Sequence, residues 1–301
     1  MKNITNVYEA VGWNKAKSTL VIVLFIAFVV GVVWVFTQAF GYGPELIGSA
    51  LIFSGLMSFA SYWFSDRIIL SISGARPADR KRDFHFYTVA ENLALAAGLP
   101  KPKLYVIDDS SPNAFATGRD PGHAVVCATT GLLEKLDRTE LEGVIGHELS
   151  HVGNYDTRLM SIVAILAGIV VLLADWMLRM SWHSDDDRDN KARGVLMVVA
   201  ILLALLSPII AQLIQLAISR RREFLADASS AKLTRFPEGL ARALVKISAD
   251  REPLEAANKA TAHLYIVNPL KNRHDAVGWF AGLFNTHPPV EERIKALRAM
   301  V

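Results

Sequence analysis

The sequence predicts a mainly α-helical protein with a small β-sheet, in which a soluble domain is joined to transmembrane helices. Three observations lead to this prediction: a membrane-like composition, long uncharged apolar runs, and a folded-domain pattern between those runs. Hydrophobic residues make up 52% of the 301 residues and charged residues only 20%. The net charge of +3 is small and spread along the chain, so we expect no nucleic-acid partner. The single cysteine, Cys127, excludes an internal disulfide and fits a reducing compartment.

Residues 1–65 are predicted to form a transmembrane hairpin. The apolar run at 20–40 is long enough to cross the hydrocarbon core of a bilayer, and no charge occurs between Lys17 and Glu45. A second uncharged run at 46–65 follows a short loop that contains two glycines and a proline. The first run is too long for the core of a signal peptide, and it has no evident small-residue cleavage site.

Basic residues flank this hairpin at its two outer ends. The loop between the runs has no Lys or Arg, whereas basic residues precede the first run and follow the second. They are Lys15, Lys17, Arg67, Arg76, Arg80, Lys81 and Arg82. Because Lys and Arg accumulate on the cytoplasmic side of membrane spans, we expect the N-terminus and the chain after residue 65 to lie in the cytoplasm.

Residues 66–158 are predicted to form the first half of the soluble domain. Its expected elements are a helix at 82–97, a strand at 104–107, a β-hairpin with strands at 113–117 and 123–129, and a further helix. Thr139 and Glu142 have the spacing of a capping box at the start of that last helix. Cys127 lies among apolar residues of the second hairpin strand, which indicates a buried residue and not a nucleophile.

Residues 159–219 are predicted to form a second hydrophobic pair, and residues 220–301 the second half of the soluble domain. The stretch at 159–174 has only 16 residues without a charge, which is short for a span, whereas 194–219 is long enough. A pair returns the chain to the side it left, so both halves share one compartment. In the last part we expect helices at 221–233, 237–249, 254–263 and 289–300, with a long loop at 264–288.

The motif His147-Glu148-Leu149-Ser150-His151 lies on the last helix of the first half. Two histidines four residues apart lie on one helix face, so both imidazoles can bind one metal ion. The glutamate after the first histidine lies beside that metal, where it can accept a proton from a bound water. The motif therefore predicts a catalytic zinc site.

A catalytic zinc commonly takes three protein ligands, so a third ligand is expected elsewhere. The metzincin pattern requires a glycine and a histidine where this chain has Asn154 and Thr157, which excludes that subclass. Glu223 is the best remaining candidate, because its predicted helix begins on the same side of the membrane as the motif. Asp227, one turn later, can hydrogen-bond the back of a ligand histidine. The alternative interpretation of this pair is a solvent-exposed acidic helix face.

Several segments together resemble the HtpX family of integral-membrane zinc metalloproteases, relatives of the CAAX prenyl protease of the yeast mating-factor pathway. These are the N-terminal hydrophobic hairpin, Asn113-Ala114-Phe115-Ala116, the motif at 147–151 continued to Asp156, the second hydrophobic pair, Arg222-Glu223-Phe224-Leu225-Ala226-Asp227, and Thr286-His287-Pro288-Pro289 followed by Arg293. The resemblance covers nearly the whole chain. It implies a zincin-like metalloprotease domain joined to the membrane helices.

The resemblance also implies a role for each residue of the site. His147, His151 and Glu223 would bind one Zn²⁺ per chain, and Glu148 would be the general base. Asp156 and Asp227 would support the ligand histidines, and His287 would donate to the developing oxyanion. Asn113, Ala114, Phe115 and Arg293 would bind substrate, with the strand pairing to an extended polypeptide. Without the resemblance, His287 would be interpreted as a helix-start residue.

The family role implied is a zinc metalloendopeptidase in the bacterial cytoplasmic membrane, a multi-pass protein with its catalytic domain in the cytoplasm. Its partners would be the lipid bilayer and polypeptide substrates, membrane proteins among them, in quality control under stress. Two alternatives stay open: a membrane-tethered chaperone-like or binding protein with a structural zinc, and a CAAX-type processing peptidase. Glu148 argues against a structural zinc, because a closed structural site has no use for a glutamate there.

Overall fold

The computed structural model describes residues 7–40, 45–166, 220–250, 252–255, 261–267, 269 and 288–300. The helices in these parts are α1 (Val7–Phe40), α2 (Glu45–Trp63), α3 (Ser65–Ile72), α4 (Phe84–Ala96), α5 (Thr130–Lys135), α6 (Arg138–Gly153), α9 (Arg220–Thr234), α10 (Pro237–Ala249) and α12 (Val290–Arg298). The strands are β1 (Arg76–Pro77), β2 (Lys103–Ile107), β3 (Ala114–Thr117) and β4 (Val125–Thr129). The predicted fold class, mainly α with a small sheet, is confirmed.

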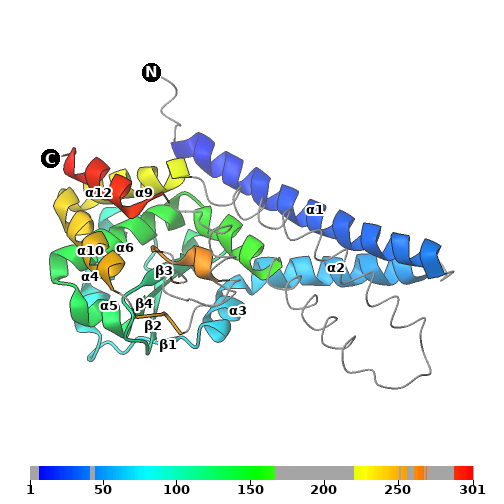
Figure 1. Ribbon diagram of the computed structural model, residues 1–301, viewed down its shortest axis with the longest axis horizontal. Coiled ribbons are helices and arrows are strands. Elements are labelled where there is room, and N and C mark those ends of the chain that lie inside the picture. Colours follow the sequence, from blue (N-terminus) through cyan, green and yellow to red (C-terminus); the bar gives the residue numbers. More distant parts are fainter. Residues whose placement is uncertain are drawn as a thin grey trace.

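The two N-terminal helices pack against each other and extend away from the rest of the molecule (Figure 1). Among the described residues, one helix is long and apolar enough to cross a membrane by itself, over Asn14–Gly31. The segments Ile47–Trp63 and Ser65–Ile72 meet the same criterion only together, as a pair bent by 81°. Large apolar side chains are exposed along both helices, namely Leu20, Val23, Leu24, Trp34, Leu51, Ile52, Phe53, Leu56 and Phe59. This surface suits contact with lipid.

The sheet has the strand order β1-β2-β4-β3. β3 and β4 form the predicted antiparallel hairpin, and β2 pairs with β4 in parallel. β1 adds an antiparallel edge to β2. β3 therefore forms the other edge of the sheet, and it contacts α6, the helix that carries both histidines of the motif.

Alternate side chains of the strands enter two separate hydrophobic cores, as the period of a strand requires. Ala116 and Val126 enter the core built with α4, α6 and α10. Phe115 and Cys127 face the other way, toward α3, the middle of α1 and the helical stretch at 156–166. Because both faces are covered, all residues of β3 and β4 are buried, which confirms a buried Cys127.

Small residues allow α9 and α10 to approach α6 closely. A Cβ atom added to Gly143 would lie 2.7 Å from the Cα of Leu240 on α10. One added to Gly146 would lie 2.8 Å from the hydroxyl of Ser230 on α9. That hydroxyl donates to the carbonyl of Gly143 at 2.7 Å. These contacts hold α9 against the helix face that carries the motif.

Two local predictions are corrected. The capping box of α6 consists of Asp137 and Glu140, each side chain accepting from the other residue's backbone N–H, and not of Thr139 and Glu142. The helix predicted at 254–263 is absent from its described residues, since Leu254 lies outside any helix and only a 3-10 turn, Ala262–Leu264, occurs there. Most of the second hydrophobic pair, from 167 to 219, lies outside the described residues, as does most of the loop predicted at 264–288.

Candidate metal centre

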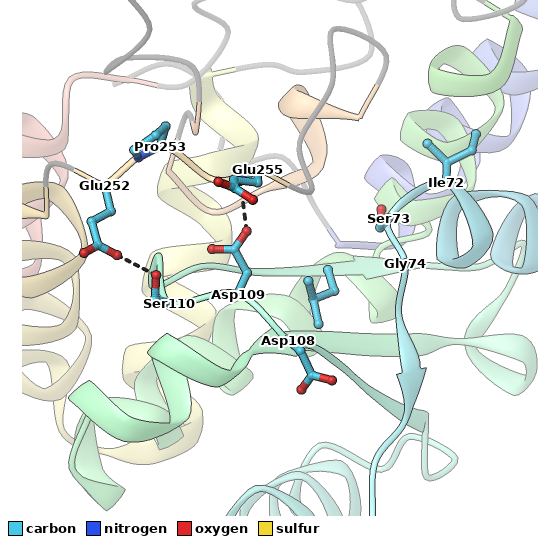
Figure 2. Close-up of a pocket in the computed structure, with 10 residues that line it drawn as sticks. Ile72, Ser73, Gly74, Asp108, Asp109, Ser110, Glu252, Pro253 and Glu255 are labelled. Atoms are coloured by element: carbon cyan, nitrogen blue, oxygen red, sulfur yellow. Dashed lines mark hydrogen bonds between the residues drawn. The ribbon is translucent and has the colours of Figure 1, made fainter.

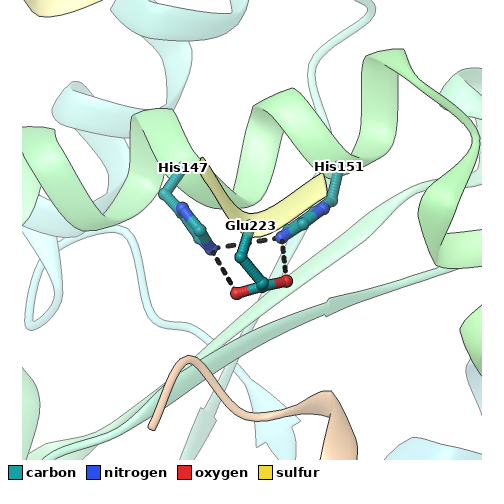
Figure 3. Close-up of side chains that lie close together, drawn as sticks. All are labelled: His147, His151 and Glu223. Carbon is teal, nitrogen blue, oxygen red and sulfur yellow. Dashed lines mark hydrogen bonds and ion pairs between the residues drawn. The ribbon is translucent and has the colours of Figure 1, made fainter. Parts of the chain in front are cut away.

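The two histidines of the motif face each other on α6. Their Nε2 atoms are 3.1 Å apart, and both side chains are buried. α9 brings Glu223 to the same point, with its carboxylate oxygens 3.8 Å from Nε2 of His147 and 3.4 Å from Nε2 of His151. Figure 3 shows this arrangement of the three side chains. The structure therefore brings together all three residues that were predicted as metal ligands.

His147 is supported from within the soluble domain. Its Nδ1 lies 2.9 Å from Oδ1 of Asp227, one turn after Glu223 on α9. Asp227 is held in turn by Arg293 of α12, which donates to both carboxylate oxygens at 2.9 and 2.7 Å. The same guanidinium donates to the carbonyl of Ile266 at 3.0 Å and is fully buried. Arg293 and His147 thus fix both carboxylate oxygens of Asp227.

His151 is supported differently. Its Nδ1 lies 3.0 Å from Oδ2 of the buried Asp156, which follows α6 after a short turn. The other oxygen of Asp156 accepts from the side-chain amide of Asn14 at 2.7 Å. Arg222 of α9 lies near the same oxygen, with its Nε at 3.3 Å. Asn14 belongs to α1, so the long apolar helix at the N-terminus contributes directly to the surroundings of the metal centre.

Burial and neighbouring charges give the two histidines opposite pKa shifts. Burial lowers the pKa of His147 to about 4, although the hydrogen bond to Asp227 opposes this change. Burial also lowers the pKa of His151, but the hydrogen bond to Asp156 and the charge of Glu223 outweigh it and raise this pKa to about 9. The carboxylates around His151 thus favour its protonated form, whereas burial favours the neutral form of His147.

The donor set fits a zinc ion. With both Nδ1 atoms directed at carboxylates, both Nε2 atoms point toward the carboxylate of Glu223. Two ligand atoms bound at about 2.0–2.1 Å around a tetrahedral zinc are separated by about 3.3 Å. The three separations of 3.1, 3.4 and 3.8 Å lie close to this value. A bound dication would displace the proton of His151, because histidine binds metals as the neutral imidazole.

Glu148 lies beside this group on α6 and not within it. The side chain is buried, and burial raises its pKa to about 7. The charge of His151 opposes this shift, and so does the nearby backbone N–H of Ala116 on β3. A carboxylate with a pKa near neutrality, next to a metal site, is suited to accept and return a proton.

The edge of β3 is partly occupied by the chain itself. The carbonyl of Ala114 accepts from the N–H of Ile266 at 3.0 Å. The side-chain amide of Asn113 donates to the carbonyl of Val267 at 2.9 Å. Phe115 points into the core and packs edge-on against Tyr265. The part of this edge nearest to Glu148 is therefore Ala116, and the predicted substrate contacts of Asn113, Ala114 and Phe115 stay predictions.

Two further predicted residues need separate statements. His287 lies outside the described residues, so its position relative to the metal centre is not described. Arg293, predicted to contact substrate, is buried and donates to Asp227 and Ile266. Sequence reasoning did not find Asn14 or Arg222 as partners of Asp156. A polar residue at the head of an apolar run was the only signal that pointed to Asn14.

A hollow of about 580 Å³ lies at the end of β2, and none of its lining residues belongs to the metal centre. Figure 2 shows its acidic residues, several of which are held by the chain. The hydroxyl of Ser110 donates to Glu252, and the N–H of Glu255 donates to Asp109. Arg76 pairs with Asp108. These carboxylates thus have structural partners around the opening.

Several known proteins are similar in sequence to this chain over most of its length. A protease HtpX homolog of Dictyoglomus thermophilum is 45% identical over 293 residues, which cover 97% of this chain and 94% of that protein. One of Caldanaerobacter subterraneus subsp. tengcongensis is 43% identical over 298 residues, or 97% of each chain. One of Thermococcus kodakarensis is 46% identical over 258 residues, 85% of this chain and 87% of that protein.

A solved structure, that of S. mikatae Ste24p, is similar to this chain with a TM-score of 0.50 at 20% identity. The similarity covers 93% of this chain and 65% of the Ste24p chain, and it shows a shared fold. The family model described as Peptidase family M48 matches residues 80–301, which include the motif helix, α9 and α12. The chain therefore belongs to peptidase family M48, a family of metalloproteases, and is a relative of the HtpX proteases.

Proposed function

We propose that this protein is a membrane-anchored, zinc-dependent endopeptidase that hydrolyses peptide bonds of misfolded or membrane proteins, in quality control under stress. The observation that carries the proposal is the convergence of His147, His151 and Glu223, with the buried Glu148 next to them. This donor set, two imidazoles and one carboxylate, is typical of catalytic zinc in peptidases. One Zn²⁺ per chain is expected.

Each residue of the centre has a task in this mechanism. His147, His151 and Glu223 would hold the zinc, which when bound polarises the scissile carbonyl and lowers the pKa of water to about 7. Glu148 accepts a proton at its carboxylate during attack and delivers it to the leaving amine. Asp156 and Asp227 fix the tautomers of the two histidines, so that Nε2 is directed at the ligand position. His287 and Arg293 keep their proposed roles near the oxyanion and the substrate.

An extended polypeptide is the substrate form that suits the sheet edge. Because Asn113 and Ala114 already bond to Val267 and Ile266, pairing would centre on Ala116, next to Glu148. A stretch of unfolded chain can adopt the strand geometry that such pairing needs. A folded domain cannot supply it, which is why misfolded proteins and exposed membrane-protein segments are the proposed substrates.

The Glu148→Gln variant tests the proposal. It should bind zinc as the wild type does, because Glu148 is not among the ligands, and it should lose roughly 10²–10⁴-fold in proteolytic rate. The measurements are metal content of the detergent-purified protein and cleavage of a casein-type unfolded substrate. The matched control is Glu142→Gln on the same helix, where the carboxylate pairs with Arg138 at the surface and the rate should not change.

Other outcomes would favour other functions. A variant Glu148→Gln that cleaves at a substantial fraction of the wild-type rate would remove Glu148 from the mechanism. A wild-type protein that binds zinc but cleaves no peptide would indicate a binding or chaperone-like protein with a structural zinc. Cleavage confined to lipidated C-terminal peptides would indicate a CAAX-type processing peptidase.

We also propose that the protein is a multi-pass protein of the bacterial cytoplasmic membrane with residues 66–158 and 220–301 in the cytoplasm. Basic residues at both outer ends of the first hairpin support this orientation. Leu95→Cys on α4 (83% exposed) and Val245→Cys on α10 (42% exposed) should resist an impermeant maleimide in intact cells and react after permeabilisation. Burial should keep Cys127 unreactive toward the maleimide, because it raises the pKa of that thiol far above its ordinary value. Labelling of either site in intact cells would overturn the orientation.

A further inference from the structure

The first membrane helix contacts the metal centre through one polar side chain. Asn14 is 2% exposed, although it lies at the start of the segment of α1 that is apolar enough to cross a membrane. Its amide nitrogen donates to Oδ1 of Asp156 at 2.7 Å and to the carbonyl of Asn154 at 2.9 Å. Asn154 lies in the turn that directly follows the helix of the two histidines, and Asp156 begins the next helical stretch, 140 and 142 positions away in sequence.

The surrounding contacts fix the geometry of this turn. Asn154 is the C-cap of α6, and Tyr155 has the left-handed backbone conformation, with a φ of 60°. The ammonium of Lys15, next to Asn14 on α1, lies 4.4 Å from the centre of the Tyr155 ring. Asp156, which follows this turn, is also contacted by Arg222 of α9, whose Nε lies 3.3 Å from its Oδ1. Residues of α1 and of the helix that carries Glu223 therefore both hold the chain after α6.

We propose that Asn14 is a positioning residue of the metal centre, which holds the carboxylate of Asp156 toward His151 and so makes the first membrane helix a part of that centre. Asp156 uses Oδ2 for His151, so its orientation depends on the donors that hold Oδ1. Arg222 of α9 also lies near this oxygen, with its Nε at 3.3 Å, so the amide of Asn14 adds a shorter, directed hydrogen bond beside a cation. Replacing the direct hydrogen-bond partner of a ligand histidine, here Asp156, typically changes metal affinity 10–100-fold, so a residue that acts through Asp156 should lie at the lower end of this range.

The inference rests on the proposed zinc site, and its test measures zinc affinity and not only activity. Full-length protein in detergent is titrated with zinc against a competing chelator. Asn14→Leu keeps the side-chain volume and removes the donor, so it should weaken zinc binding by roughly tenfold. Asn14→Gln keeps the amide and should restore most of the affinity. Ser18→Ala is the matched control, because that buried hydroxyl donates within α1, to the carbonyl of Asn14.

A double-mutant cycle separates positioning from a general loss of stability. If Asn14 acts through Asp156, then Asn14→Leu should cost no further affinity once Asp156→Asn is present. Additive losses, or an Asn14→Leu variant that binds zinc as tightly as the wild type, would overturn the inference. Should Asn14→Leu fail to fold, Asn14→Asp takes its place, since a second carboxylate against Asp156 should weaken zinc binding even more, and wild-type affinity there would also overturn it. A wild-type protein that binds no zinc would instead contradict the proposed function.

Discussion

The two ligand histidines lie one turn apart on α6, yet they are supported by different parts of the chain. His147 depends on Asp227 and Arg293, which belong to α9 and α12. His151 depends on Asp156, whose second oxygen is held by Asn14 of α1 and lies near Arg222 of α9. The support of His147 comes from helices late in the chain, whereas that of His151 includes a residue of the N-terminal apolar helix.

This difference indicates which helices must pack together before each histidine is held in place. The pair of Asp227 and Arg293 joins α9 to α12, so the support of His147 forms when these helices pack together. The support of His151 is complete only when α1 docks onto the turn after α6. Val21 and Phe25 of α1 also pack against one face of the sheet, so the docking of α1 contributes to the core as well as to the support of His151.

The largest effect is expected from breaking the support of His147. Arg293→Leu would leave Asp227 buried without its cation, and removing one partner of a buried pair typically costs about 3–5 kcal/mol. The free energy of unfolding should fall by that amount in urea titrations followed by circular dichroism in detergent. Zinc binding should be lost as well, because the carboxylate no longer has a fixed position behind His147.

Arg298→Leu is the control for this variant. Arg298 lies on the same helix and pairs with Glu238, but its side chain is 53% exposed, so its loss should change the stability by less than about 1 kcal/mol. Equal unfolding midpoints for the two variants would show that Asp227 does not depend on Arg293. In that case the contacts that hold His147 would be no stronger than those that hold His151.

Short-range patterns allowed much of the fold to be predicted. The β3–β4 hairpin and α6 follow from apolar alternation, a glycine-containing turn and helical spacing, all of which act within a few residues. The capping box of α6 was predicted two residues too late, because Asp137/Glu140 and Thr139/Glu142 both match its pattern. The described residues at the two ends of the helix expected at 254–263 are not α-helical, and the chain after it, at Tyr265, Ile266 and Val267, is held by contacts with β3, Asn113 and Arg293.

The residues of the candidate site also form two groups: those that sequence motifs predict and those that only tertiary packing brings to the site. The three predicted ligands come together because each lies in a motif with a recognisable chemical role. Asn14 carries no such motif, and its contact with Asp156 joins positions 142 residues apart. The burial of Arg293 and its pairing with Asp227 likewise depend on how α12 packs on α9. Sequence patterns indicate which residues can bind a metal, but the residues that hold those ligands are set by tertiary packing.

The smallest effect is expected at the opposite end of α6, where neither histidine support reaches. Asp137 caps this helix by accepting from the N–H of Glu140, and Asp137→Ala should lower the free energy of unfolding by about 1 kcal/mol. Zinc affinity should stay unchanged in the chelator titration, which would show that affinity follows the two supports and not helix stability alone.

The hydrogen bond from Thr139, together with the N–H of Glu140, holds the pKa of Asp137 below its ordinary value. Its contribution is therefore complete above about pH 4 and is lost as the pH falls through the lowered pKa, so the unfolding midpoints of variant and wild type should converge in acid. A gap between them that persists in acid, or a drop in zinc affinity at neutral pH, would contradict this account of the helix end.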